Sequence, residues 1–339
     1  MLEHVRALCA IAGTSGDEGQ VAEYIVSQLP ADARITRDAL GNLLVFRKGA
    51  AAPKRRVMLC AHMDEVGFLV THITKEGLLR FAAVGGVDAR VALGRQVAVG
   101  SEGLVGVIGT KAVHMQKEEE RGKAPGIDEL YIDIGASSDD EAKAHVTLGD
   151  RVTFVSDFTE YGEGFLKARA LDDRVGCAIL LTLLREELPF DLHAAFTVQE
   201  EVGLRGARTA AYTIAPELAL VLETTTAADI PGVSGENRVC ELKKGPVVSF
   251  MDRSTIYDRE LYALAFEEAE RLGIPCQTKS LVAGGNDSGA IHTSVGGVRT
   301  AVISVPCRYL HSPSCVIALE DLEHSLTLAR ALVNRMAAL

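Results

Sequence analysis

The sequence is poor in aromatic residues and holds no tryptophan; aromatic side chains account for 5% of its 339 residues. Sites that bind carbohydrate often offer aromatic rings as stacking surfaces, so this scarcity argues against a glycoside hydrolase. Long apolar runs are missing too, since none approaches the roughly 18 residues that a membrane-spanning helix requires. The formal net charge of −11 argues against nucleic acid or an anionic membrane as a partner, because both carry negative charge.

Closely spaced cysteine pairs are also lacking. The 7 cysteines are odd in number and scattered, and none forms a Cys-x-x-Cys pair, so neither a disulfide framework nor a thiolate zinc site is indicated. The first residues, MLEHVRALCA, carry an acid at once and lack the basic stretch of a secretory signal. We therefore expect a reduced, cytoplasmic enzyme.

What the sequence does contain is an alternation of strand-like and helical segments. Hydrophobic residues make up 47% of the chain, which allows a sizeable core, and the length suggests about two domains. Such alternation predicts a largely parallel sheet covered by helices. The expected strands lie at 57–61, 193–198, 217–222, 277–282 and 300–305, and the expected helices at 172–188, at 260–273 and from about 320 onward.

A different pattern fills residues 67–159. Short β-type segments are separated there by glycine turns, which is typical of a small all-β domain, and the charged segment 115–126 is expected to be an exposed loop. We therefore predict an α/β protein with two parts. Residues 1–66 and 160–339 would form a three-layer α/β/α catalytic domain with a mostly parallel sheet, and residues 67–159 an inserted small β-barrel.

Residue types that bind metals stand directly after several predicted strands. The apolar run VMLCA leads into His62-Met63-Asp64, and residues two apart in an extended chain point the same way. The carboxylate of Asp64 could thus support the imidazole of His62 on a metal ion by fixing its tautomer. A histidine that merely ends a strand at the surface explains this stretch equally well.

Four further stretches place acids or a histidine at comparable positions. Asp172-Asp173 precedes a helix, where one aspartate suffices as a cap, while Glu200-Glu201, Glu223 and His311 follow apolar strands. Taken alone, the adjacent glutamates fit a strand that simply ends in solvent. Ligands of open α/β sheets bind at the carboxyl edge of the strands, however, and the joint pattern favours a site there.

The chemistry of this residue set indicates which ions would fit. Two imidazoles with carboxylates and no thiolate suit zinc, cobalt or manganese. The acids outnumber what one ion needs, which favours a pair of ions roughly 3.5–4 Å apart and bridged by one carboxylate.

Six stretches in a fixed order carry a resemblance to a known family: AHMDEVGF, LDDRVG, VQEEVGLRGA, LETTTAADIPG, GGNDSG and RYLHSP. Each motif is weak alone, whereas the ordered set is specific and spans nearly the whole chain. The set resembles the M42 family of metallo-aminopeptidases, which includes the glutamyl and the tetrahedral aminopeptidases. The resemblance implies a metal-dependent aminopeptidase that holds two zinc or cobalt ions per subunit, with manganese as a third candidate.

The resemblance also implies a role for each residue. Asp172 would bridge the two ions, with one histidine on each. Glu200 would act as general base, taking a proton from a water that the ions activate and returning it to the leaving amine. Asp64 would orient the first histidine. The implied metal ligands are His62, Asp172, Glu201, Glu223 and His311.

Further expectations follow from the same resemblance. The substrates would be short peptides with a free N-terminus, and the inserted domain would be PDZ-like and help to build a large hollow homo-oligomer, often a dodecamer. Asp287 could help to shape the substrate pocket, although a plain glycine turn explains its loop nearly as well. Two residues depart from the family pattern: Glu223 where aspartate is common, and Asn286 where threonine is common.

Three alternatives stay open at this point. A related dinuclear deacylase or amidohydrolase would use the same ligands on acylated substrates. A glycoside hydrolase of the endoglucanase type would use the paired carboxylates without a metal. A metal-bound scaffold would hold ions tightly and turn over no peptide. The remaining histidines are read as structural or surface residues: His72, His114, His145, His193, His292 and His324.

Overall fold

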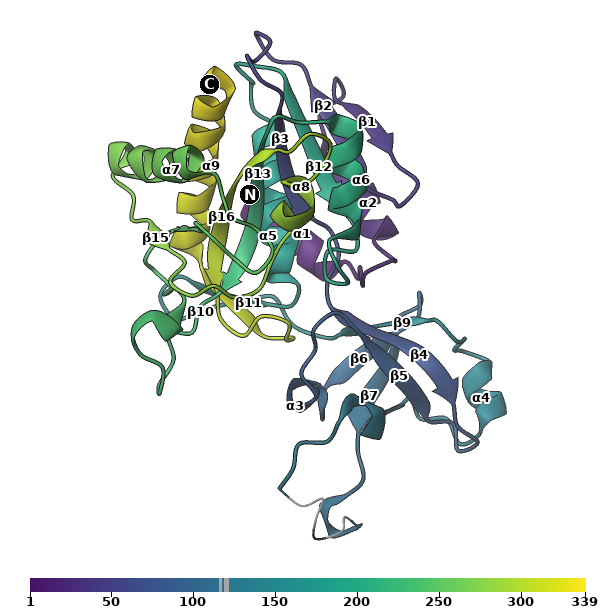
Figure 1. The fold of residues 1–339 in the computed structure, drawn as a ribbon. Coiled ribbons are helices and arrows are strands. Elements are labelled where there is room, and N and C mark those ends of the chain that lie inside the picture. The colour runs from purple at the N-terminus through teal and green to yellow at the C-terminus, as the bar shows by residue number, and fades with distance from the viewer. Residues whose placement is uncertain (116–117, 119–121) are drawn as a thin grey trace.

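The computed structural model describes residues 1–115, 118 and 122–339, so residues 116, 117 and 119–121 of the expected loop at 115–126 lie outside the described part. The described residues build an eight-stranded sheet, a three-stranded sheet and a closed barrel. In Figure 1 the barrel forms a lobe of its own, while both chain ends lie in the larger lobe that contains the main sheet.

The main sheet has four parallel strands at its centre. β12, β3, β13 and β16 pair in parallel, and antiparallel pairs flank them on both sides. All six residues of β3 are buried, as expected of a strand covered on both faces. Across the sheet the strands are β1 (Arg34–Arg37), β2 (Leu43–Arg47), β12 (Leu192–Thr197), β3 (Val57–His62), β13 (Leu218–Thr226), β16 (Arg299–Cys307), β14 (Val247–Val248) and β15 (Gln277–Thr278).

Helices cover the main sheet on both faces. Successive side chains of a strand point to opposite faces, so Leu59 packs into one hydrophobic core and Cys60 into the other. The larger core is closed by α1 (Leu2–Ala10), α2 (Gly19–Gln28), α5 (Leu171–Leu184), α7 (Arg259–Leu272) and α9 (Leu319–Ala338). The smaller core is closed by α6 (Arg205–Ile214) and α8 (Ser288–Ile291).

The barrel has a separate core around Phe68 and Phe154. Its strands, in order around the barrel, are β4 (Gly67–Ile73), β5 (Leu79–Val84), β8 (Tyr131–Asp133), β7 (Leu104–Gly109), β6 (Gln96–Val99) and β9 (Arg151–Phe154). Two short helices accompany it, α3 (Ala89–Ala92) and α4 (Asp139–Lys143). The three-stranded sheet consists of β10 (Thr159–Tyr161), β11 (Phe165–Ala168) and β17 (Cys315–Ala318).

The predicted mixed α/β fold with a small β-barrel is confirmed. One predicted strand is wrong in its extent, because only Gln277–Thr278 of 277–282 pairs with a neighbour. The strand lies at the open edge of the sheet, and the chain leaves it when the amide of Ser280 donates to the carbonyl of Val239. Among the described residues, no helix combines the length and the apolar character that crossing a membrane takes.

Candidate metal centre

The candidate ligands gather at the carboxyl edge of the central parallel strands. β3 ends at His62, β12 leads into Glu200-Glu201, and β13 carries Glu223 near its end. Asp172 opens the helical segment α5, and His311 follows β16 in the loop before β17. Because parallel strands all end at one edge, side chains between 62 and 311 in the sequence meet in one place.

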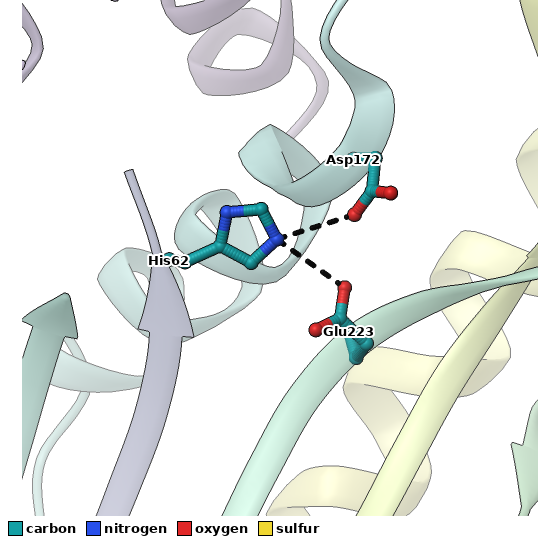
Figure 2. A group of neighbouring side chains, drawn as sticks. All are labelled: His62, Asp172 and Glu223. Carbon is teal, nitrogen blue, oxygen red and sulfur yellow. Dashed lines mark hydrogen bonds and ion pairs between the residues drawn. The ribbon is translucent and has the colours of Figure 1, made fainter. Parts of the chain in front are cut away.

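His62 and two carboxylates form the first group, drawn in Figure 2. The Nε2 atom of His62 lies 3.3 Å from Oδ1 of Asp172 and 3.6 Å from Oε1 of Glu223. Its Nδ1 lies 3.1 Å from the backbone oxygen of Asp64 and 3.5 Å from Oδ1 of the same residue. Both oxygens accept hydrogen bonds, so a neutral His62 keeps its proton on Nδ1 and turns the Nε2 lone pair toward the two carboxylates.

His311 and two carboxylates form the second group. The Nε2 atom of His311 lies 3.2 Å from Oε2 of Glu201 and 3.4 Å from Oδ2 of Asp172. Its Nδ1 donates to the backbone oxygen of Gly86 at 2.9 Å. The ring therefore presents its Nε2 to acids, as in the first group, but its second nitrogen is held by a residue of the barrel.

Asp172 is common to both groups. Its Oδ1 faces His62 and its Oδ2 faces His311. Within each group, His62-Asp172-Glu223 and Asp172-Glu201-His311, one ligand atom per residue lies within 4.8 Å of the others. A carboxylate with one oxygen toward each of two ligand groups is the arrangement that two neighbouring cations require.

The adjacent aspartate has a structural position instead. Asp173 is fully buried, and its carboxylate accepts the backbone amides of Gly176 at 2.9 Å and His62 at 3.3 Å. It therefore caps the start of α5 and ties that helix to the end of β3. The peptide bond between Asp172 and Asp173 is cis.

Asp64 holds the two adjacent glutamates in place. Its fully buried carboxylate accepts the backbone amides of Glu200 at 3.0 Å and Glu201 at 3.1 Å, and the hydroxyl of Ser15 at 2.6 Å. The same residue touches Nδ1 of His62. One carboxylate thus fixes the end of β3 relative to the turn after β12.

Glu200 and Glu201 differ in their partners. Glu201 reaches His311, whereas Glu200 is in neither ligand group; both glutamates line a cavity of about 500 Å³. Both histidines and Glu223 line the same cavity. Further residues that line it are Thr224, Thr225, Thr226, Val239, Lys279 and residues 283–285.

Burial and crowding shift the pKa values of these groups strongly. Burial raises the pKa of Glu201 and of Glu223 to about 8, and the charge of Asp172 adds to both shifts. Burial also raises the pKa of Glu200 well above its usual range. Burial alone would lower the pKa of His311, but the carboxylates of Asp172 and Glu201 raise it to about 10. Such opposed shifts mark a site where buried acids compete for too little positive charge.

The residues present fit a pair of divalent cations. Oε1 of Glu201 is buried and has no hydrogen-bond partner among the described residues, which is costly unless a cation occupies its lone pairs. Every donor is an imidazole nitrogen or a carboxylate oxygen, as zinc, cobalt and manganese accept. Of the described residues, the other histidines belong to neither ligand group.

The loop GGNDSG has a structural core and a pocket-facing edge. Asn286 donates to the hydroxyl of Tyr257 at 2.9 Å, and its side-chain oxygen accepts the amide of Ser288 at 2.9 Å. The carboxylate of Asp287 is 1% exposed and accepts from Thr197 and Cys60. Residues 283–285 line the cavity, whereas Asp287 does not. Its role in shaping the substrate pocket stays a prediction, and Asp287 would exert it through the position of the loop.

Three contributors escape the sequence patterns: Ser15, Gly86 and Lys279. Ser15 and Gly86 reach the site from segments far away in the chain, and neither residue type suggests metal chemistry. Lys279 stands in a segment that reads as a strand, so its place in the cavity wall has no local signal. For Gly86, the sequence shows a glycine pair at 85–86 between two predicted strands, which indicates a turn but not a contact with the site.

Comparison with known proteins finds aminopeptidases along nearly the whole chain. The family model described as M42 glutamyl aminopeptidase matches residues 41–328. A curated protein of Acetivibrio thermocellus with a provisional aminopeptidase name is 38% identical over 333 residues, covering 97% of each chain. A TET aminopeptidase structure from Thaumarchaeota archaeon SCGC AB-539-E09 superposes with a TM-score of 0.93 at 35% identity, covering 99% of this chain and 96% of that one.

A third match bears on assembly. The TET1 peptidase of Pyrococcus horikoshii, a protein described as able to assemble into a tetrahedron or a large octahedral shell, superposes with a TM-score of 0.85. It is 36% identical, and the match covers 98% of both chains.

Proposed function

The chain belongs to the M42 family of aminopeptidases, and we propose that it is a metal-dependent aminopeptidase that releases N-terminal residues from short peptides. The observation that carries this proposal is the pair of ligand groups that share Asp172 beside the cavity-lining carboxylate of Glu200.

Two divalent ions, zinc, cobalt or manganese, would occupy the centre. His62 and Glu223 would hold one ion and Glu201 and His311 the other, with Asp172 between them. When bound, such ions lower the pKa of a coordinated water to about 7 and polarise a carbonyl oxygen. Asp64 would position this set, since it contacts His62 and the backbone of both glutamates.

Glu200 would act as general base and then as general acid. Its carboxylate would accept the proton of the attacking water on one oxygen and deliver it to the nitrogen of the leaving amine. Its place in the cavity, outside both ligand groups, leaves it free to do so. Burial raises the pKa of Glu200, which favours a group that can both take and return a proton near neutral pH.

We propose that the cavity wall around Lys279 receives the side chain of the first substrate residue. The Nζ atom of Lys279 donates to the carbonyl of Ala283 at 2.7 Å, and no carboxylate forms an ion pair with it among the described residues. Burial lowers the pKa of Lys279, so the cation gains from any negative partner that enters. Lys279 therefore favours an acidic first residue, Glu or Asp.

The domain organisation, the assembly and the location of the protein are further proposals. Residues 1–66 and 160–339 would form the three-layer catalytic domain, which the helices on both faces of the main sheet support. Residues 67–159 would form a PDZ-like insertion that takes part in a homo-oligomer, for which a dodecamer is one candidate size. The assembly of the similar TET1 peptidase supports a homo-oligomer. We also propose a cytoplasmic location.

The test is hydrolysis of aminoacyl anilides carrying Glu, Asp, Leu, Lys or Ala, each with a free and with an acetylated N-terminus. The protein would be stripped with a chelator and reloaded with zinc, cobalt or manganese. Metal-dependent cleavage confined to free amines is expected. Cleavage of the acetylated series would instead identify a deacylase, and tight metal binding without cleavage a scaffold. Cleavage of a β-glucan after chelation would identify a glycoside hydrolase.

A further inference from the structure

The two histidines of the centre are held in different ways. His62 is 2% exposed, and its Nδ1 meets Asp64, two residues along the same chain segment. His311 is 34% exposed and sits in a loop. Among the described residues, no residue of the α/β lobe forms a hydrogen bond with Nδ1 of His311. Its hydrogen-bond partner is the carbonyl of Gly86 in the barrel. The first ring is therefore oriented from within its own lobe and the second from outside it.

The barrel touches the second ligand group at two places through one turn. Residues 85–88 connect β5 with α3, and the carbonyl of Gly86 lies 2.9 Å from Nδ1 of His311. A Cβ atom at Gly85 would lie 3.3 Å from Cβ of Glu201 and 2.7 Å from Val66. The turn thus lies directly against His311 and Glu201, the two ligands that belong to the second group alone.

A further contact ties the barrel exit to the loop of His311. After β9, the hydroxyl of Ser156 donates to the carbonyl of Pro313, two residues beyond that histidine. The loop is therefore held on one side by the turn at 85–88 and on the other by the chain that leaves the barrel.

We propose that the barrel completes the second metal site, with the carbonyl of Gly86 as the positioning group for His311. A carbonyl oxygen can only accept, so a neutral His311 must carry its proton on Nδ1, which leaves the Nε2 lone pair to face Asp172 and Glu201. Such outer contacts fix the ring orientation and make the ligand more basic. This inference rests on the proposed two-ion centre and adds that half of it depends on the inserted lobe.

The same contact explains why glycine stands at position 86. Its φ angle lies outside the left-handed region, so backbone freedom is not the reason. A Cβ atom there would lie 3.2 Å from Nδ1 of His311, closer than ordinary van der Waals contact, and would push the ring away from the carbonyl. Gly86→Ala should therefore disturb the second site while leaving the first intact.

The experiment is a titration of the metal-free protein with cobalt, followed by its visible absorption. Gly86→Ala is expected to weaken one of two binding equivalents by about 10- to 100-fold and to leave the other unchanged. Gly296→Ala is the matched control, because its added Cβ meets nothing within 4 Å and its φ is not positive. An isotherm of Gly86→Ala that equals that of Gly296→Ala would overturn the inference.

A double-mutant cycle assigns the loss to one group. In a His62→Ala background, which leaves the His311 group, Gly86→Ala should weaken cobalt binding further. In a His311→Ala background it should have no additional effect, since its target is already gone. Equal losses in both backgrounds would mean a general distortion and would contradict the proposal. Should single-histidine variants bind no cobalt, the comparison with Gly296→Ala in the intact chain decides.

Failure of this inference is distinguishable from failure of the proposed function. An unchanged protein that binds no cobalt would overturn the metal centre itself. An unchanged protein that binds two ions and cleaves free-amine anilides, with Gly86→Ala binding identically, would leave the proposed function standing and remove only the role of the barrel.

Discussion

Asp64 explains how two adjacent glutamates are accommodated at the end of a buried strand. Its carboxylate accepts both of their backbone amides, which fixes the turn and lets the side chains diverge. Glu201 reaches His311, while Glu200 belongs to neither ligand group, and both line the cavity. Only one of the two acids thus belongs to a ligand group, and the charge of Glu201 still contributes to the raised pKa of Glu200.

Glu200→Gln separates proton transfer from metal binding. Because Glu200 belongs to neither ligand group, the variant should keep two ions yet lose at least about 10²-fold in kcat. Glu201→Gln, the matched variant next door, should instead lose an ion. Metal content by atomic absorption and turnover of an anilide check both. Normal turnover by Glu200→Gln would remove its assignment as the base.

Lys279→Met tests the preference for an acidic first residue. Methionine keeps an unbranched apolar stem close in size to that of lysine and removes the charge, so kcat/KM for a Glu anilide should fall about 10-fold or more relative to a Leu anilide. Lys244→Met, at an exposed position, should leave that ratio unchanged. A ratio that stays constant in Lys279→Met would refute the proposed role of the wall, without bearing on the metal centre.

Helix α7 shows how a cap links an element to the sheet. Asp258 accepts the amides of Glu260 and Leu261 at 3.0 Å each, and Arg299 of β16 donates to the same carboxylate at 2.8 and 2.9 Å. The helix begins at Arg259 because this acid satisfies its first free amides. One residue thus fixes the start of α7 and its place against the sheet.

Asp258→Ala should lower the free energy of unfolding by about 0.5–2 kcal/mol, the usual range for losing a cap. The hydrogen bonds from Arg299 lower the pKa of Asp258 below its usual value. Its stabilising contribution is therefore complete above about pH 4, the unfolded pKa, and is lost as the pH falls through the folded pKa. Urea unfolding at pH 7 and pH 3 measures this, with Glu267→Ala on the same helix as control. If the loss in free energy of unfolding caused by Asp258→Ala were larger at pH 3 than at pH 7, the expected pH dependence would be contradicted.

The elements that could be predicted are those with a strong local pattern. The buried run before His62 and the amphipathic stretch after Asp172 are visible in the sequence, because their periodicity follows from burial on one or both faces. The predicted strand at 277–282 is longer than the observed one. An edge strand has few neighbours, and this one ends where the amide of Ser280 donates a hydrogen bond to the carbonyl of Val239 in a distant loop. The same pattern of strand ends predicts the candidate ligands, and the structure brings them together at one edge of the sheet, but no local pattern tells which acid faces which histidine.

Residues that act across lobes could not be predicted. Gly86 and His311 are separated by 225 positions, and the contact depends on how the barrel seats against the sheet. Lys279 acquires its place in the cavity because the loop at 283–285 folds back onto it. Such contacts follow from tertiary packing, which no short window of sequence encodes.

The assembled centre also predicts how the whole molecule responds to metal. Without ions, the ligand groups bury more acid than base, and Oε1 of Glu201 lacks a partner among the described residues. A ligand that binds only the folded state stabilises it, by about 2.7 kcal/mol when its concentration is 100 times Kd. Chelation should therefore lower Tm by several degrees, and zinc or cobalt should restore it.

The measurement is differential scanning calorimetry at fixed protein concentration, because a chain without tryptophan gives a weak fluorescence signal and the Tm of the proposed homo-oligomer would depend on concentration. Glu200→Gln should respond to chelator and metal like the unchanged protein, since it keeps both ligand groups. The double variant His62→Ala/His311→Ala should lose the response, because each group then lacks its imidazole. A full response in the double variant would place the stabilising ions elsewhere in the molecule, and so would separate metal dependence from the centre at the sheet edge.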